Sequence, residues 1–226
     1  MEKQEELAEL MENRAVLYRL LERLYRWEVK AAELPVWKQL QRPEPCGIPA
    51  LDEGYARLTV ALRHLDAAGL ETLAVDYAAV FLGAGMARDE AAYPYESVYT
   101  SVKHLVMQDA RDQVLNIYHQ NGLEPVNTGE PEDHIALEFH FMAYLCEEAA
   151  GRLRAGEPAA AQRLIAVQAN FFQAHLVNWI PRFCGDIRKY AHTEFYKAIS
   201  QITEGMLELE DKILESLGAV GMEETA

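Results

Sequence analysis

Apolar residues recur at intervals of three and four positions along almost every long segment of the chain. This spacing places them on one face of an α-helix, and it constrains the fold more than any other feature of the sequence. The first run predicts a helix of roughly 25 residues and consists of Leu7, Leu10, Leu17, Leu20, Leu21, Leu24 and Trp27. Later runs predict helices over residues 51–65, 70–81, 98–117, 131–151, 158–177, 181–190 and 193–217, with a short helical piece at 36–40. Ser97 is the expected N-cap of the helix at 98–117.

No segment shows the alternation of β-branched residues that a strand would need. We therefore expect an all-α fold, a single bundle-like domain of about eight to ten helices over residues 1–226. A polar connection at 121–130 is a candidate hinge, with an N-terminal lobe at 1–121, the hinge itself at 122–130 and a C-terminal lobe at 131–226. Exchange of lobes across this hinge would give a homodimer, and the sequence leaves monomer and homodimer open.

The charge balance limits the possible partners. The formal net charge is −15, which argues against nucleic acid, because phosphate binding needs clustered Lys and Arg. No apolar stretch approaches the ~20 residues that span a bilayer, and the acidic start, MEKQEELAEL, is unlike a signal peptide. Three scattered cysteines form no Cys-x-x-Cys pair. The sequence therefore predicts a soluble, cytoplasmic protein without stable membrane insertion.

Residues 130–145, EPEDHIALEFHFMAYL, hold the densest group of reactive side chains. Pro131 suits the first position of a helix, which would place Glu132 and Asp133 in its first turn. At 100° per residue, His134 and Glu138 project into the apolar arc of that helix, whereas His140 and Glu147 face solvent.

Several interpretations of the inward pair His134 and Glu138 stay open. They could be a core histidine bonded to a carboxylate, two ligands of a metal, an acid/base pair, or part of a pocket for a ligand or peptide. A metal site needs three or four ligands, and only two are present. Acid/base catalysis lacks a nucleophile motif nearby.

A second region, residues 81–97, is an irregular loop rich in aromatic rings. Tyr77 and Phe81 close the helix before it, and Tyr93, Tyr95 and Tyr99 follow within 18 residues. These rings either fold back on the core or line a groove. Gly83 and Gly85 do not form a phosphate-binding loop. Elsewhere, Phe195 and Tyr196 are expected in the core, and a solvated face is expected for Glu208, Glu210, Asp211 and Glu215.

In these two regions the sequence resembles the TorD/DmsD/NarJ-type maturation chaperones of molybdenum redox enzymes. The resemblance rests on Tyr77-x-x-x-Phe81-Leu82-Gly83, on residues 93–99, YPYESVY, and on residues 130–142, EPEDHIALEFHFM. It implies an all-α protein with no catalytic activity, cofactor or metal of its own. Such a protein binds the twin-arginine signal peptide and the apo form of a molybdopterin-dependent oxidoreductase, assists cofactor insertion and delays export. Tyr95 stands where some members carry tryptophan.

A twin-arginine peptide has a cationic head and an apolar segment, so it needs carboxylates and an aromatic groove. Asp133 and Glu96 are the candidate partners of the arginines, and Phe81, Tyr95 and Tyr99 are candidates for the groove. The full set of candidate peptide-binding residues is Tyr77, Phe81, Tyr95, Glu96, Tyr99, Asp133, His134 and Glu138. The alternatives are a helical metal-dependent enzyme using His134 and Glu138, a nucleotide-responsive regulatory protein, or a structural assembly subunit.

Overall fold

The computed structural model describes residues 2–86, 90–124 and 129–223, and over these residues the chain is helical and contains no strand. This confirms the all-α prediction. The ten α-helices are α1 (Glu2–Arg26), α2 (Leu34–Trp37), α3 (Pro49–Arg63), α4 (Ala67–Leu82), α5 (Glu96–Thr100), α6 (Asp109–Gln120), α7 (Ile135–Arg154), α8 (Pro158–Phe171), α9 (Ile180–Tyr190) and α10 (Glu194–Glu223). A 3₁₀ turn at Ala31–Glu33 precedes α2, and a π-helical turn at Phe172–Leu176 follows α8. None of these helices is long and apolar enough to cross a bilayer.

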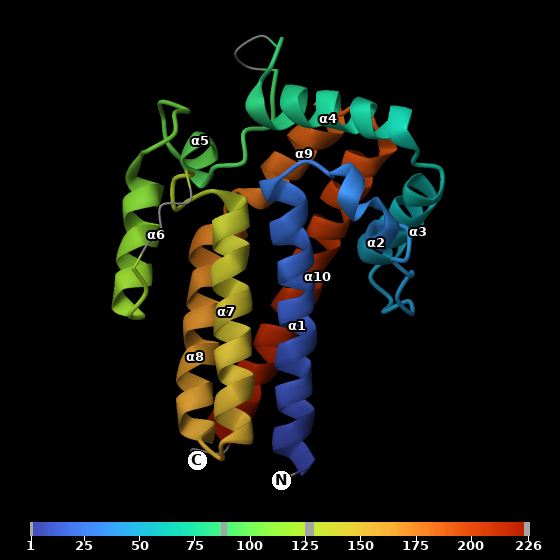
Figure 1. Ribbon diagram of the computed structural model, residues 1–226. Helices are drawn as coiled ribbons and strands as arrows, with labels where there is room; N and C mark the ends of the chain where they lie inside the picture. The colour runs from blue at the N-terminus through green and yellow to red at the C-terminus, as the bar shows by residue number, and fades with distance from the viewer. Residues whose placement is uncertain (1, 87–89, 125–128, 224–226) are drawn as a thin grey trace.

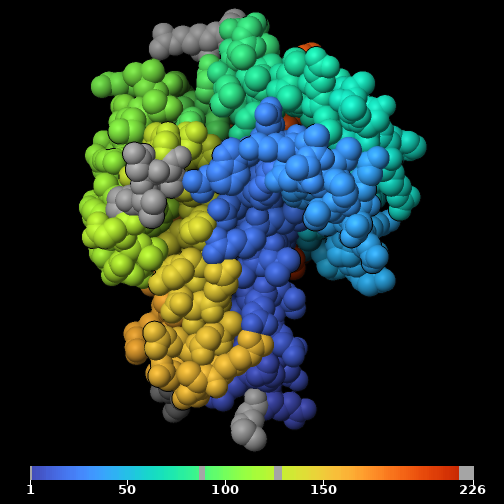
Figure 2. Space-filling view, in the orientation of Figure 1, coloured from blue at the N-terminus to red at the C-terminus, as the bar shows by residue number. Residues whose placement is uncertain are grey.

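Four long helices form the body of the molecule. Helices α1, α7, α8 and α10 run along one another, with α1 and α7 side by side (Figures 1 and 2). Helix α3 packs against α10, and α4 lies across the end of the bundle opposite the start of α1. Helices α5 and α6 lie beside the start of α7. The regions that resemble maturation chaperones therefore meet at the end of the bundle nearest α4.

One continuous hydrophobic core runs from Ala15 to Leu214 and includes residues on both sides of the candidate hinge. A smaller cluster at the other end of the bundle joins α1, α7 and α8 through Ala8, Met11, Ala149, Ala150, Leu153, Ala161 and Ile165. Residues 125–128 of the candidate hinge lie outside the described residues. The division into lobes and their exchange in a dimer stay predictions.

Helices α3 and α10 approach closely because glycines face their neighbours. A Cβ atom added at Gly205 would come within 2.7 Å of the Cα of Leu51, and one at Gly54 would come within 2.7 Å of the side chain of Ile202. Real Cβ atoms need well over 3 Å, so only glycine allows this packing.

Glu210 corrects the prediction of a solvated face on α10. Its carboxylate is buried and accepts a hydrogen bond from Nε of Arg14 at 3.0 Å, and the two side chains form an ion pair inside the bundle. Glu208 and Glu215 are exposed, as expected. A buried charge is tolerated only when it is paired, and the partner here comes from α1, far away in sequence.

The single helix predicted over 98–117 is also wrong. Helix α5 ends at Thr100 and α6 starts at Asp109, with a loop between them. His104 and Met107 adopt φ angles of 51° and 59° in this loop, which a right-handed helix excludes. Ser97 is not an N-cap, because α5 begins one residue earlier, after Tyr95. The run predicted over 158–177 is helical, but it widens from an α-helix into the π-helical turn after Phe171.

Candidate functional site

The segment EPEDH forms a turn in front of α7 instead of the first turn of the helix. Helix α7 begins at Ile135, and His134 is its N-cap, with Nδ1 of the imidazole accepting a hydrogen bond from the Ala136 N–H at 3.1 Å. The backbone of His134 is extended, and its N–H donates to the Pro131 carbonyl at 3.0 Å. The prediction that Glu132 and Asp133 lie in the first helical turn is therefore wrong. Glu132 instead pairs with Arg111 of α6.

This turn joins the two regions that carry the resemblance to maturation chaperones, residues 93–99 and 130–142. Tyr95 and His134 form an isolated antiparallel bridge, in which the Glu96 N–H donates to the Asp133 carbonyl at 3.0 Å and the Ile135 N–H to the Pro94 carbonyl at 2.9 Å. The Asp133 carboxylate also accepts a hydrogen bond from the Ser97 N–H at 2.8 Å. Asp133 therefore holds the start of α5 against the start of α7.

Glu96 points inward and ties α5 to the π-helical turn. Its carboxylate lies 2.8 Å from Nδ1 of His175 and accepts a hydrogen bond from the side-chain amide of Asn178 at 2.7 Å. Trp179 donates its indole N–H to the His175 carbonyl at 2.6 Å, which fixes the same turn from the other side. Glu96 and His175 are both buried. Wide turns of this kind are frequent at functional positions in helices.

Glu138 is fully buried but is not bonded to His134. Among the described residues, neither carboxylate oxygen has a hydrogen-bond partner of good geometry. Burial, and then the negative charges of Glu96 and Asp133, raise the pKa of Glu138 well above its ordinary value. The protonated carboxyl is therefore favoured in the folded protein. The prediction of an inward-facing Glu138 is confirmed, whereas the interpretation of the pair as a core histidine bonded to this carboxylate is not borne out among the described residues.

His134 and Asp133 are also shielded from solvent, with consequences for their charge. Burial, and then the positive charge of Arg26, lower the pKa of His134 to about 3, so the imidazole is neutral near pH 7. Burial raises the pKa of Asp133. In the part of the chain that the structure describes, no three His, Cys, Asp or Glu side chains are placed to hold a metal ion together.

Tyr77 and Phe81 pack into the core. The Tyr77 hydroxyl donates to the Tyr25 carbonyl at 3.0 Å, and Phe81 packs edge-on against Tyr25 and Tyr196. Phe81 is 1% exposed. Phe195 and Tyr196 are buried, as predicted.

Tyr95 reaches the surface, where it meets a carboxylate. Its hydroxyl donates to Glu130 at 2.6 Å, and its ring packs edge-on against His134, with centroids 5.0 Å apart. The charges of Glu130 and Glu28 also act on Tyr77, whose pKa is raised to about 12, mainly by burial. We call the part of the surface at Tyr95 and Glu130, between residues 91–95 and the turn before α7, the Tyr95 surface.

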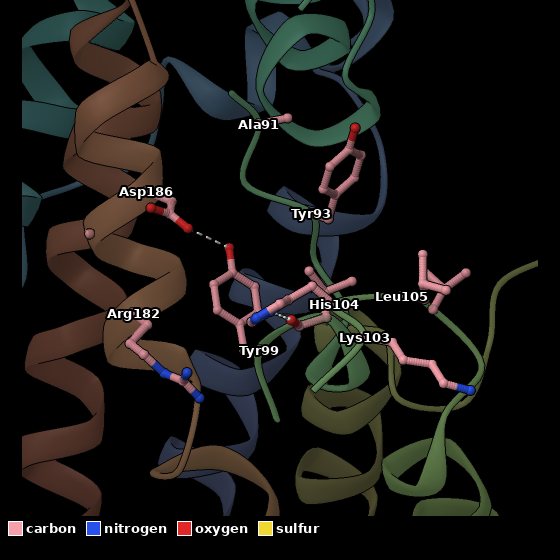
Figure 3. A pocket seen from close by; sticks show the side chains of 11 residues that line it. Ala91, Tyr93, Tyr99, Lys103, His104, Leu105, Arg182 and Asp186 are labelled. Carbon is pink, nitrogen blue, oxygen red and sulfur yellow. Dashed lines mark hydrogen bonds between the residues drawn. The ribbon is translucent and has the colours of Figure 1, made fainter. Parts of the chain in front are cut away.

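A separate pocket of about 880 Å³ lies between α5, α9 and the loop at 101–108. Tyr99 is the one candidate site residue in its lining, and its hydroxyl donates to the Asp186 carboxylate at 3.0 Å (Figure 3). Arg182 and Lys103 also line it. Sequence reasoning missed Arg182 and Asp186. The two residues are four apart in a helix predicted to begin at Pro181, and this spacing would place both on one helix face.

Comparison with known proteins places the chain in a family. The family model of the nitrate reductase delta subunit matches residues 48–185. The chaperone protein TorD of Vibrio cholerae serotype O1 is 27% identical over 221 residues, covering 94% of this chain and 97% of that protein. The chaperone protein TorD of Aliivibrio salmonicida is 29% identical over 223 residues, covering 92% and 98%.

A solved structure shares the fold. A proposed redox enzyme maturation protein from Archaeoglobus fulgidus matches with a TM-score of 0.51 and 19% identity, over 86% of this chain and 93% of that one. The named relatives are chaperones rather than enzymes, and the resemblance drawn from the two sequence regions is confirmed. With a family match over more than half of its length, this protein is a chaperone that belongs to the nitrate reductase delta subunit family.

Proposed function

We propose that the chain is a cytoplasmic chaperone dedicated to one molybdenum oxidoreductase. It binds the twin-arginine signal peptide and the apo form of this client, assists cofactor insertion and delays export until the cofactor is in place. Binding must precede export, which is why the proposal places it in the cytoplasm. The relatedness to proteins named TorD chaperones and the likeness to a redox enzyme maturation protein support this role.

The observation that carries the peptide-binding proposal is the Tyr95–Glu130 hydrogen bond. It sets an aromatic ring beside a carboxylate at the point where the two family-like regions meet. A guanidinium can pair with the carboxylate and stack on the ring at the same time.

The burial of Asp133 and Glu96 supports a supporting role for both, in place of direct contact with the arginines. Both carboxylates are bound inside the protein, Asp133 to Ser97 and Glu96 to His175 and Asn178. In this proposal they hold the Tyr95 surface in shape, and Glu130 meets the arginines.

Titration calorimetry with a synthetic peptide tests the proposal. The peptide carries two adjacent arginines before an apolar segment, and a second peptide replaces both arginines with glutamines. We expect binding of the arginine peptide that weakens as salt rises, because exposed charges are screened. Glu130→Gln removes one charge-assisted bond and should weaken binding about tenfold.

Glu148→Gln supplies the matched control, since Glu148 is half-buried in the second half of α7, away from the Tyr95 surface. It removes the same charge and should leave the affinity unchanged. Equal affinity for the two peptides, or equal losses in both variants, would remove the Tyr95 surface from the site.

A further inference from the structure

The loop between α5 and α6 exposes apolar side chains that a soluble surface would not normally carry. Val102 is 97% exposed and Met107 is 56% exposed, and Leu105 and Val106 are exposed beside them. Contiguous exposed apolar groups of this kind mark interaction surfaces.

Polar bonds hold this loop in shape, so the exposure is built into the structure. His104 Nδ1 lies 2.8 Å from the Val98 carbonyl, and the Gln108 side-chain amide donates to the carbonyls of Val106 and Met107 at 3.0 Å. His104 and Met107 both adopt left-handed backbone conformations, which cost free energy in residues other than glycine. A strained loop that presents apolar side chains is typical of a binding site.

The same loop forms one wall of the 880 Å³ pocket. Leu105 and Val106 come from the loop, Val98 and Tyr99 from α5, and Tyr93 from the preceding segment (Figure 3). The volume lies in the range of pockets that bury a ligand of drug or short-peptide size. Tyr99 is fixed at its base by the bond to Asp186 and by ring contact with Trp179, with centroids 5.4 Å apart.

Positive charge dominates the mouth of the pocket. Arg182 of α9 and Lys103 of the loop lie on opposite sides of it in Figure 3. Among the residues that the structure describes, neither has a carboxylate partner: the Arg182 guanidinium lies over the Tyr99 ring, 5.8 Å from its centroid, and Asp186 is engaged by the Tyr99 hydroxyl. Arg182 makes one hydrogen bond, to the Asn178 carbonyl at 3.3 Å. Two cations without a carboxylate partner beside an apolar wall are unusual on a chain with a net charge of −15.

We infer that this pocket binds an apolar segment of a partner protein that carries a carboxylate. The apolar side chains of the segment cover the wall formed by Val98, Leu105 and Val106, and its carboxylate lies between Lys103 and Arg182. This charge requirement is opposite to that of the twin-arginine peptide. The pocket is therefore a second binding site, separate from the Tyr95 surface, and the inference does not depend on signal-peptide binding.

Calorimetry with a set of capped peptides tests this inference on the full chain. The probe is Leu-Val-Glu-Val-Leu, and two matched peptides replace the glutamate with glutamine or lysine. Each charge-assisted bond lost should weaken binding about tenfold. We expect the glutamate peptide to bind. The glutamine peptide should bind about tenfold or more weakly, and the lysine peptide should bind most weakly of the three.

Two double variants of equal charge locate the site. Lys103→Gln with Arg182→Gln should abolish the preference for glutamate, and Lys38→Gln with Lys189→Gln should retain it. Lys38 and Lys189 are exposed and lie outside the lining of the pocket. Thermal unfolding of each variant verifies that the fold is retained.

Four results would overturn the inference: no binding of the glutamate peptide up to millimolar concentration, equal binding of the three peptides, unchanged preference in the pocket variant, or displacement of the probe by the twin-arginine peptide. Sedimentation equilibrium covers a further alternative. If the wild type dimerises and the pocket variant is monomeric while no peptide binds, the occupant is a second copy of the chain and the inference is wrong.

Discussion

The Asp133 carboxylate accepts a hydrogen bond from the backbone N–H of Ser97 at 2.8 Å, while its carbonyl accepts one from the N–H of Glu96 at 3.0 Å. A single residue thereby joins the YPYES segment to the turn before α7. These bonds hold two regions that are far apart in the sequence in contact with each other. A change at Asp133 should therefore affect the fold before it affects any ligand.

Asp133→Ala should lower the free energy of unfolding by about 1–3 kcal/mol, because the buried Ser97 N–H loses its acceptor. Asp133→Asn keeps an acceptor oxygen at the same place and should retain most of that stability. Urea unfolding followed by circular dichroism measures both. If the alanine and asparagine variants are equally stable, the bond to Ser97 does not carry the stabilisation.

Glu138 should make stability depend on pH. The folded protein holds the Glu138 proton more tightly than the unfolded chain, in which the pKa lies near 4.5. The stability that this group contributes is complete below pH 4.5 and is lost as pH rises toward its folded pKa. Glu138→Gln mimics the protonated form, so its advantage over the wild type should grow with pH, by at most about 1.4 kcal/mol per unit.

Unfolding free energies of the wild type and Glu138→Gln at pH 5, 6, 7 and 8 test this. The lowered pKa of His134 destabilises the folded state below pH 6.5. His134 is present in both proteins, so its contribution to the unfolding free energy cancels in the difference. Parallel pH curves would show that the Glu138 pKa is not raised in the folded state.

Gly205→Ala should destabilise the protein by several kcal/mol, on the order of the overpacking cost of a core change, because the new methyl group collides with the Leu51 backbone. Gly218 lies on the same helix with open space where its Cβ would be. Gly218→Ala should therefore stabilise it, by about 0.5–1 kcal/mol. Melting temperatures that move in the same direction in both variants would contradict the close approach of α3 and α10.

Glu210→Gln should cost about 3–5 kcal/mol, because it leaves the Arg14 guanidinium buried without a counter-charge. Glu208→Gln, on the same helix but exposed, should have little effect. Chemical denaturation of the two variants provides the comparison. A loss below about 1 kcal/mol for Glu210→Gln would place this pair with ordinary surface ion pairs.

Long periodic runs of apolar residues made the helices of the bundle predictable from the sequence. The leucines from Leu7 to Leu24 lie in α1 and pack in or against the two hydrophobic clusters, whereas Trp27 follows the end of the helix and is largely exposed. The run from Val98 to Ile117 failed because Val102, Leu105 and Val106 are exposed, so their spacing reflects a surface rather than a buried face. Periodicity alone does not distinguish the two cases.

The candidate site was harder to predict, because its geometry depends on contacts between distant segments. Asp133 and Glu96 were found as reactive groups, but their burial follows from Ser97, His175 and Asn178, which only the fold brings near. Glu210 looked like a surface residue because its partner lies on α1. The spacing of Arg182 and Asp186 places both on one helix face, but only the fold brings Asp186 to the Tyr99 hydroxyl in a pocket.

The client itself provides the most direct test of the chaperone account. The tagged chain is purified from its native cell during molybdenum starvation, and the bound proteins are identified by mass spectrometry. The account predicts one molybdenum oxidoreductase that lacks its cofactor and retains its twin-arginine signal peptide. Recovery of no oxidoreductase, or only of the mature and cofactor-loaded form, would contradict it.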